Sequence, residues 1–486
     1  MQTVACLSCG APVNFRSHAS VMAVCEYCNA TMLKDADTVR YIGKMSAVLE
    51  DYSPIQVGSS GAFGSRNFNV VGRIQLRYAH GMWNEWYLVF DDASTGWLGD
   101  SSGLYVITTV REATKTLPSF DQIVPGRQYD MGGQRFTSSE KQVAQCIGGQ
   151  GELPFKVEEG WEAKVADFRS GASFVTLDYS DGEQPAVYNG TSVTLADLKM
   201  QLLREDDQIK ASAGKFRGKL DALDCPSCGS SIKYIPGVTS NLVCPACAAA
   251  LDAAGPEATV LAAGESVAQR LTTLQLGATA KIQNADYTVI GAMIRADEEG
   301  TEWNEYLLYS TRNSFFWLVE TDEGWFRATV QHKWPEWASL ASESATLDNV
   351  KYTKLYDYTA TVNYAAGAFN WRVAAGDTVQ VYEFESGDAT LAAEVTAQEM
   401  TWSRSTPVEW SQVKAWFGDG ILGSAPAAKA GSSKPGSIQS KFLWWILGLN
   451  AVPLVFAFSH TFLYTIIALI AIYFPSSYFK DGAEKK

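Results

Sequence analysis

Short apolar or alternating runs, separated by glycine-rich turns, fill most of this chain before its C-terminal part. Residues 68–76 (FNVVGRIQL) are rich in β-branched side chains, and residues 86–90 (WYLVF) are aromatic and aliphatic. Similar runs recur at 287–290 and 306–309. Short runs of this kind, bounded by polar turns, predict antiparallel strands in small barrels or sandwiches. We therefore expect a mainly β fold.

Helical periodicity is rarer. Four leucine and isoleucine positions recur at helical spacing through residues 194–212, which predicts a helix between two halves of the chain. We place a helical connector at 201–223. A second short helix is expected within residues 35–49.

The C-terminal part changes character. Residues 424–440 are rich in small side chains and predict a flexible linker. The apolar tract 442–474 would measure ~50 Å as one helix, against ~30 Å of hydrocarbon. We therefore expect a transmembrane segment at 441–479, as a two-helix hairpin or as one tilted or kinked pass. Lysines flank both ends, which predicts that the N-terminal modules lie on the cytoplasmic side of the membrane.

Eight of the nine cysteines form two identical frames, each a Cys-x-x-Cys pair, a 15-residue gap and a second Cys-x-x-Cys pair. This spacing predicts two zinc ribbons, at 1–34 and 224–252, each with a closed four-thiolate site for a structural Zn²⁺. Disulfides are the alternative, which we disfavour because the N-terminus has no charged and apolar export signal. The predicted metal ligands are Cys6, Cys9, Cys25, Cys28, Cys225, Cys228, Cys244 and Cys247.

The frames lie 219 residues apart, and the sequence after them is repeated as well. Val71-Gly72 matches Ile290-Gly291, and Trp83-Asn84-Glu85 matches Trp303-Asn304-Glu305. Further on, Gly151, Val165 and Phe168 match Gly367, Val381 and Phe384. The chain is thus a tandem duplication of a ribbon followed by a β module, at 50–200 and 270–418.

No catalytic motif stands out. None of the four histidines has a histidine opposite it in the other copy, and Cys146 faces Val362. The glycine-rich stretches do not lead into the Lys-Ser/Thr helix of a phosphate loop. We therefore predict no catalytic residues and a protein that is not an enzyme. A net charge of −14 also disfavours nucleic acid as a partner, because it would repel phosphate.

The repeated Trp-Asn-Glu motif is the best candidate for recognition. A tryptophan could stack on a ligand while the carboxylate pairs with a cation such as a polyamine. Alternatively, the polar pair shapes a turn and the tryptophan packs in the core. The candidate ligand-binding residues are Trp83, Asn84, Glu85, Trp303, Asn304 and Glu305.

Six short motifs occur together in this chain: CLSCGAPV at 6–13, VCEYC at 24–28, VGRIQLRY at 71–78, WNEW at 83–86, WNEY at 303–306 and GWF at 324–326. In this combination the chain resembles the bacterial domain of unknown function 4178 family. The family has no established activity, so no catalytic residues carry over. The resemblance implies genomic company with polyamine-type enzymes, small membrane proteins and envelope-stress systems.

Three functions follow as hypotheses. The first is a membrane-anchored cytoplasmic adaptor or scaffold that binds a protein partner, for example another small membrane protein. The second is a sensor or enzyme for a small cationic ligand at the Trp-Asn-Glu sites. The third is nucleic-acid binding through the ribbons.

Overall fold

The structure is a computed structural model in which residues 1–425 form one compact unit. The described residues run from 2 to 421, without 18, 36–37, 46–52, 79–80, 102, 113–116, 158–160, 206–222, 233–240, 253–258, 263–271, 311–313 and 419–420. The predicted linker at 424–440 and transmembrane segment at 441–479 lie outside them. Within the described part, no helix is both long and apolar enough to cross a bilayer.

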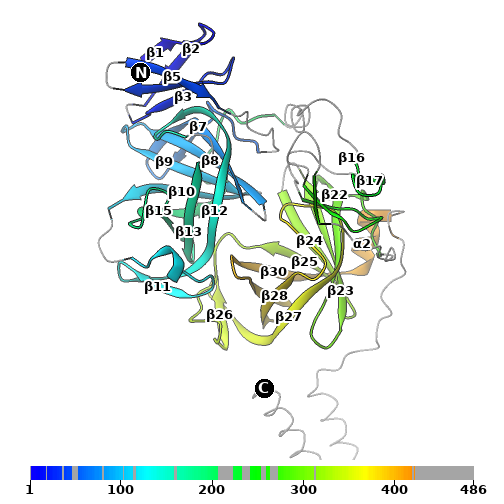
Figure 1. Cartoon of the computed structure of the whole chain (residues 1–486). Coiled ribbons are helices and arrows are strands. Elements are labelled where there is room, and N and C mark those ends of the chain that lie inside the picture. The colour runs from blue at the N-terminus through cyan, green and yellow to red at the C-terminus, as the bar shows by residue number, and fades with distance from the viewer. Residues whose placement is uncertain are drawn as a thin grey trace, which may run out of the picture. The chain divides into compact units, whose positions relative to one another are not determined.

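Each copy contains a closed, antiparallel, eight-stranded barrel, so the barrel and not the sandwich alternative is the fold (Figure 1). In both barrels a 20-residue strand pairs with the first strand and completes the ring. The first ring consists of β7 (Arg66–Tyr78), β8 (Gly81–Phe90), β9 (Thr95–Ser101), β10 (Leu104–Arg111), β15 (Ala186–Val193), β14 (Ser173–Asp178), β13 (Glu162–Ser170) and β12 (Gln134–Leu153). The second consists of β22 (Ala285–Ala296), β23 (Glu302–Ser310), β24 (Ser314–Thr321), β25 (Gly324–Val330), β30 (Met400–Val408), β29 (Ala389–Val395), β28 (Thr378–Ser386) and β27 (Val350–Phe369).

Paired glycines allow each ring to close. Gly72 on β7 faces Gly151 on β12, and Gly291 on β22 faces Gly367 on β27. A Cβ atom on Gly72 would lie 1.7 Å from the carbonyl oxygen of Glu152, and one on Gly367 would lie 2.4 Å from that of Ile290. Glycine is therefore required where the two backbones approach. This contact explains why the duplicated sequence repeats these glycines.

The ribbons are continuous with the barrels. In the first copy, β3 (Met22–Val24) pairs with β12, so the barrel sheet extends through β4 (Ala30–Asp35) and β5 (Thr38–Lys44). The expected helix at 35–49 is therefore wrong over β5, whose residues pair with β4 instead. The other ribbon strands are β1 (Gln2–Ala5) and β2 (Pro12–Phe15), and in the second copy β16 (Leu223–Asp224), β17 (Ser231–Ile232), β18 (Asn241–Val243), β19 (Ala250–Asp252) and β20 (Thr259–Ala262).

A buried carboxylate ties the first ribbon to its barrel. The side chain of Glu152 on β12 accepts hydrogen bonds from the backbone N–H of Arg16 (2.7 Å) and Ser17 (3.0 Å) and from the hydroxyl of Ser20 (2.8 Å). Three donors compensate the cost of burying a charged group.

Short elements complete each module. They are β6 (Ser60–Phe63), η1 (Phe120–Gln122), β11 (Gln128–Met131), β21 (Thr279–Ile282), β26 (Ser344–Leu347) and α2 (Trp410–Phe417). The predicted helix at 194–212 is wrong over residues 195–199, which form turns, and Lys199 has a positive φ of 48°. Its apolar spacing instead places Leu198 in a cluster with Phe68 and Trp86. Most of the predicted connector at 201–223 lies outside the described residues.

Candidate functional site

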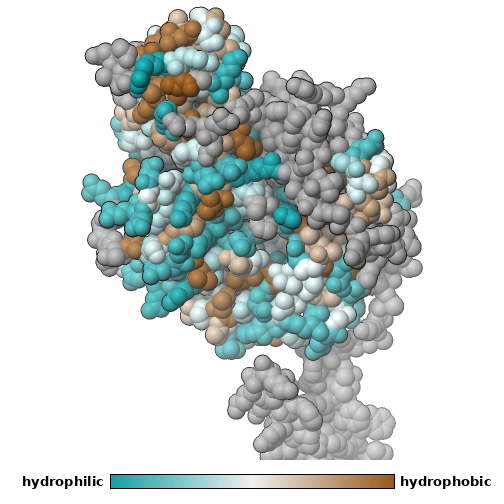
Figure 2. All heavy atoms as spheres, viewed as in Figure 1, coloured by the Kyte–Doolittle hydropathy of each residue, from teal (hydrophilic) through white to brown (hydrophobic). Residues whose placement is uncertain are grey.

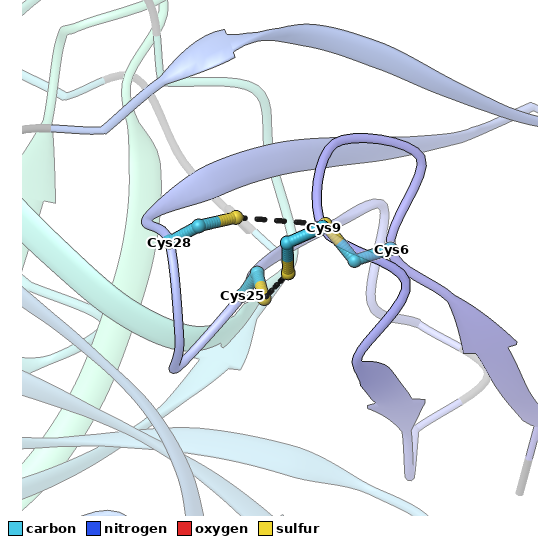
Figure 3. Close-up of side chains that lie close together, drawn as sticks. All are labelled: Cys6, Cys9, Cys25 and Cys28. Carbon is cyan, nitrogen blue, oxygen red and sulfur yellow. Dashed lines mark hydrogen bonds between the residues drawn. The ribbon is translucent and has the colours of Figure 1, made fainter.

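The eight predicted ligand cysteines meet in two clusters of four. In the first, Cys6 Sγ lies 3.7 Å from Cys28 Sγ, and Cys9 Sγ lies 3.7 Å from Cys25 Sγ (Figure 3). In the second, Cys225 and Cys247 are 3.8 Å apart, and Cys228 and Cys244 are 3.7 Å apart. Within each cluster all four sulfur atoms lie within 4.8 Å of one another. All eight cysteines are free, so the disulfide alternative is not realised.

The spacing of the sulfur atoms fits a tetrahedral metal ion. Four thiolates at a Zn–S distance of ~2.3 Å would stand ~3.8 Å apart. Each Cys-x-x-Cys turn is closed by a backbone N–H, one residue after the second cysteine, that donates to the carbonyl of the first. These donors have left-handed backbone angles and are Gly10, Asn29, Gly229 and Ala248. The four-thiolate set can thus hold one metal ion in each ribbon.

A separate candidate site lies inside the first barrel, where a cavity of about 250 Å³ is lined by residues from all eight strands. One side of it is aromatic: Trp161 stacks on Phe155 with ring centroids 5.1 Å apart, and Trp97 lies 5.9 Å from Phe155. Residues of the second copy, including Glu399, complete the wall. Eight-stranded barrels are wide enough to enclose one small ligand.

Two of the three predicted Trp-Asn-Glu residues line this cavity. Trp83 and Glu85 face it, and the indole Nε1 of Trp83 donates to Glu85 Oε1 at 2.9 Å. Asn84 points to the opposite face of β8, because side chains alternate along a strand. Its Oδ1 accepts a hydrogen bond from Nε of Arg73 at 3.0 Å.

Carboxyl groups dominate the polar lining. The acidic lining residues are Glu85, Asp100, Glu140, Asp167 and Asp178 of the first copy and Glu399 of the second, whereas Arg169 is the one basic lining residue. The guanidinium of Arg169 is already engaged: it donates to the Ser192 hydroxyl at 2.9 Å and lies over the Phe174 ring. Among the residues that the structure describes, no basic side chain forms an ion pair with Glu85 or Asp178.

Burial raises the pKa values of most of these carboxyl groups. It raises the pKa of Glu85 to about 8, with further contributions from Asp167 and Asp178. Burial and the charges of Asp167 and Glu399 raise the pKa of Glu140 to about 8. The pKa of Asp167 rises to about 6, again mainly through burial. The cavity therefore favours either protons or a cation beside its carboxyl groups.

One buried polar group in the wall also lacks a partner. The hydroxyl of Ser139 makes no hydrogen bond to any other described residue. Ser139 is only 5% exposed and lines the cavity. Buried polar groups are normally paired with protein, water or a ligand, so this hydroxyl is available to a molecule inside the cavity.

The comparisons with known proteins bear on the two modules. A family model for a domain of unknown function (DUF4178) matches residues 56–195 and 275–410, more than half of the chain. The chain belongs to the DUF4178 family. The matches coincide with the barrels and their flanking segments, and the cysteine clusters precede both. The comparisons with curated proteins and with solved structures returned no match.

The second DUF4178 barrel repeats the Trp–Glu pair with different surroundings. Trp303 Nε1 donates to Glu305 Oε1 at 2.7 Å, as in the first copy. Here, however, Arg295 on β22 bridges two carboxylates, with its Nη1 atom 3.1 Å from Glu305 Oε1 and 2.9 Å from Glu394 Oε1. Asn304 again lies apart from the pair, because its amide nitrogen donates to Glu320.

Sequence reasoning missed most of the acidic lining of the first DUF4178 barrel. Asp167 and Asp178 lie on β13 and β14, far along the chain from Glu85. A signal was nevertheless present in the duplication. In the matched strand registers, Asp167 corresponds to Glu383 and Asp178 to Glu394, so an acidic residue stands at both positions in both copies.

Proposed function

We propose that the first DUF4178 barrel is a binding site for one small organic cation, and that the protein acts as a sensor or carrier of that ligand. The observation that carries this proposal is the carboxylate-lined cavity, in which Glu85 has no basic partner among the described residues and the hydroxyl of Ser139 is unpaired. A cation would neutralise the carboxylates, and the hydroxyl oxygen of Ser139 could accept one of its hydrogen bonds.

The geometry favours an organic cation over a metal ion. Within the described part of the chain, the only groups of three or more ligand atoms close enough to share a metal are the two cysteine clusters. The aromatic side of the cavity also suits an alkylammonium or guanidinium group, which binds to the faces of aromatic rings. A volume of about 250 Å³ limits the ligand to a small molecule, such as a short polyamine.

Replacing Glu85 with glutamine is expected to weaken binding of the cation by about 30- to 1,000-fold, equivalent to about 2–4 kcal/mol. The substitution keeps the size of the side chain and removes the charge that faces the ligand. Isothermal titration calorimetry with a panel of amines and guanidines measures the effect. Glu183→Gln is the matched control, because Glu183 is exposed on the surface. Equal affinity of both variants and the wild type would contradict the proposal.

Binding of the cation should strengthen as the pH rises from 6 to 8. Glu85 and Glu140, each with a pKa of about 8, carry protons at lower pH, and those protons compete with the ligand. Without ligand, the stability of the folded chain depends on pH in the opposite direction. Because the folded-state pKa values exceed the ordinary value of 4.5, the contribution of these groups to stability is greatest below pH 4.5 and is lost as the pH rises toward 8.

Thermal unfolding between pH 5 and 8.5, with and without ligand, measures both trends. We expect the ligand to raise the melting temperature most at the alkaline end. A stabilisation that is largest at pH 5 would rule out carboxylates as the partners of the ligand.

We propose in addition that the two cysteine clusters bind Zn²⁺ as structural ions. A closed four-thiolate set leaves no position for water or substrate, so its contribution is to stability. We also propose that residues 441–479 anchor the protein in the bacterial inner membrane, with the barrels on the cytoplasmic side. The support for the anchor is the apolar sequence alone.

A specific observation favours an adaptor role as a second candidate function. Figure 2 shows apolar surface gathered on the N-terminal ribbon, where Leu7 is 62% exposed and Tyr27 75% exposed. The corresponding residues of the second ribbon are Pro226 and Ala246. Affinity purification of the full chain and of a Leu7→Ser/Tyr27→Ser variant tests this role. A stoichiometric protein held by the wild type alone would support it, and identical recoveries from both would contradict it.

A further inference from the structure

We infer that Arg295 fills the second barrel as a built-in substitute for ligand, and that the ligand of the first barrel carries a guanidinium group. The inference rests on the proposed function of the first barrel and specifies its ligand class. It also divides the two copies into one binding barrel and one barrel that is permanently occupied by its own side chain.

The strand registers make Arg295 the counterpart of Leu76. In the first barrel, Leu76 on β7 faces Trp83 on β8. In the second barrel, Arg295 on β22 faces Trp303 on β23. Pairing with the other neighbouring strand gives the same correspondence. Leu76 pairs with Cys146 on β12, and Arg295 pairs with Val362 on β27. The duplication also matches Cys146 with Val362. Leu76 lines the cavity of the first barrel, so an arginine there would project into it.

The carboxylates around Arg295 have counterparts in the first barrel as well. Glu305 corresponds to Glu85, and both accept the indole N–H of the preceding motif tryptophan. Glu394 pairs with Val381, and its counterpart Asp178 pairs with Val165. The first barrel thus presents the same two acidic positions and the same indole donor, but has a leucine in place of the guanidinium.

Arg295 shows how a cation is held in this setting. Its Nη1 atom reaches both carboxylates, and its Nη2 atom lies 3.5 Å from Glu394 Oε2. Arg295 is only 6% exposed, and although burial would lower its pKa, Glu305 and Glu394 raise that pKa above the ordinary value. A planar fork with several N–H donors can bridge separated carboxylates, which a single ammonium group does less well. The carboxylates at Glu85 and Asp178 therefore favour a guanidinium over an alkylammonium ligand.

The first test uses the full chain and two probes of similar size, methylguanidinium and methylammonium. We expect the wild type to bind methylguanidinium about tenfold more tightly in titration calorimetry. Equal or reversed affinities would overturn the inference and leave the proposed function intact. Absence of binding by either probe, and by the larger amines and guanidines, would overturn both.

Reciprocal substitutions form the second test. Arg295→Leu should lower the melting temperature of the chain and open a second site, so that methylguanidinium restores stability and binds with a stoichiometry near two instead of one. Methylammonium should restore less of the lost stability. Arg404→Leu, which removes an exposed arginine, should neither lower the melting temperature nor open a second site. If the wild type binds methylguanidinium but the probe does not restore the melting temperature of the Arg295→Leu variant, Arg295 does not act as a substitute for ligand.

Leu76→Arg keeps the inference testable if the Arg295→Leu chain does not fold. The new arginine should occupy the first barrel, abolish binding of methylguanidinium and remove the loss of stability between pH 5 and 8. A Leu76→Arg chain that still binds the probe with wild-type affinity would contradict the equivalence of the two positions.

Discussion

Substituting Cys25 by serine is expected to release one metal ion and to unfold the first ribbon. Cys25 is a buried member of the first cluster, and its sulfur lies 3.7 Å from that of Cys9. Structural zinc contributes roughly 10–16 kcal/mol of apparent binding energy in small zinc-finger domains, so loss of one thiolate should cost several kcal/mol of it.

Metal content and hydrogen exchange measure this effect. Elemental analysis should find two zinc ions in the wild type and one in Cys25→Ser, with faster exchange over β1 to β5. The control is Cys146→Ser, because Cys146 lies outside both clusters and donates only to the carbonyl of Gly148. Two ions in Cys25→Ser, or a wild type without metal that remains fully folded, would contradict the structural role of the clusters.

Substituting Gly72 by alanine is expected to destabilise the first barrel by about 3 kcal/mol or more. The new methyl group would meet the carbonyl oxygen of Glu152, and backbone atoms on both strands would have to move. Because Gly72 lies where β7 and β12 close the ring, the shift should also impair the cavity. Urea unfolding and ligand titration measure the two consequences.

Gly149→Ala provides the matched control on β12. Its methyl group would lie 3.4 Å from the carbonyl oxygen of Arg73 and would fit with little movement. We expect this variant to unfold within about 1 kcal/mol of the wild type. Similar losses for Gly72→Ala and Gly149→Ala would show that closure does not depend on the glycine pair.

The local features of the fold were predictable from the sequence because they depend on short spacings. The Cys-x-x-Cys turns require only neighbouring residues to bring two sulfur atoms to one point, and the duplication is visible by direct comparison. Strands such as β8 follow from an apolar and aromatic run. These signals indicated the ribbons, the β modules and the Trp–Glu pair.

The closed ring and its cavity could not be derived in the same way. They depend on pairing between β7 and β12, strands that are widely separated along the chain. Alternation along each strand then decides that Glu85 faces inward and Asn84 outward, which a motif alone does not reveal. The helix expected at 35–49 was wrong over β5 for a related reason, because these residues pair with β4 at the edge of the sheet.

Differences between the two barrels are the basis for proposing a guanidinium ligand in the first one. Acidic residues stand at three matched inward positions, yet only in the second copy does a guanidinium, that of Arg295, pair with the glutamates that correspond to Glu85 and Asp178. The first copy has Leu76 there and a cavity beside it. The group held in the second barrel thus indicates the kind of ligand that the cavity of the first barrel binds.

The most direct measurement is proton release on ligand binding, from calorimetric titrations of the full chain at pH 7.5 in two buffers of different ionisation enthalpy. We expect a guanidinium ligand to displace protons from the cavity carboxyl groups, and Glu85→Gln to remove most of this proton release. Absence of binding, or binding without proton release and with wild-type affinity in Glu85→Gln, would contradict the proposed cation site.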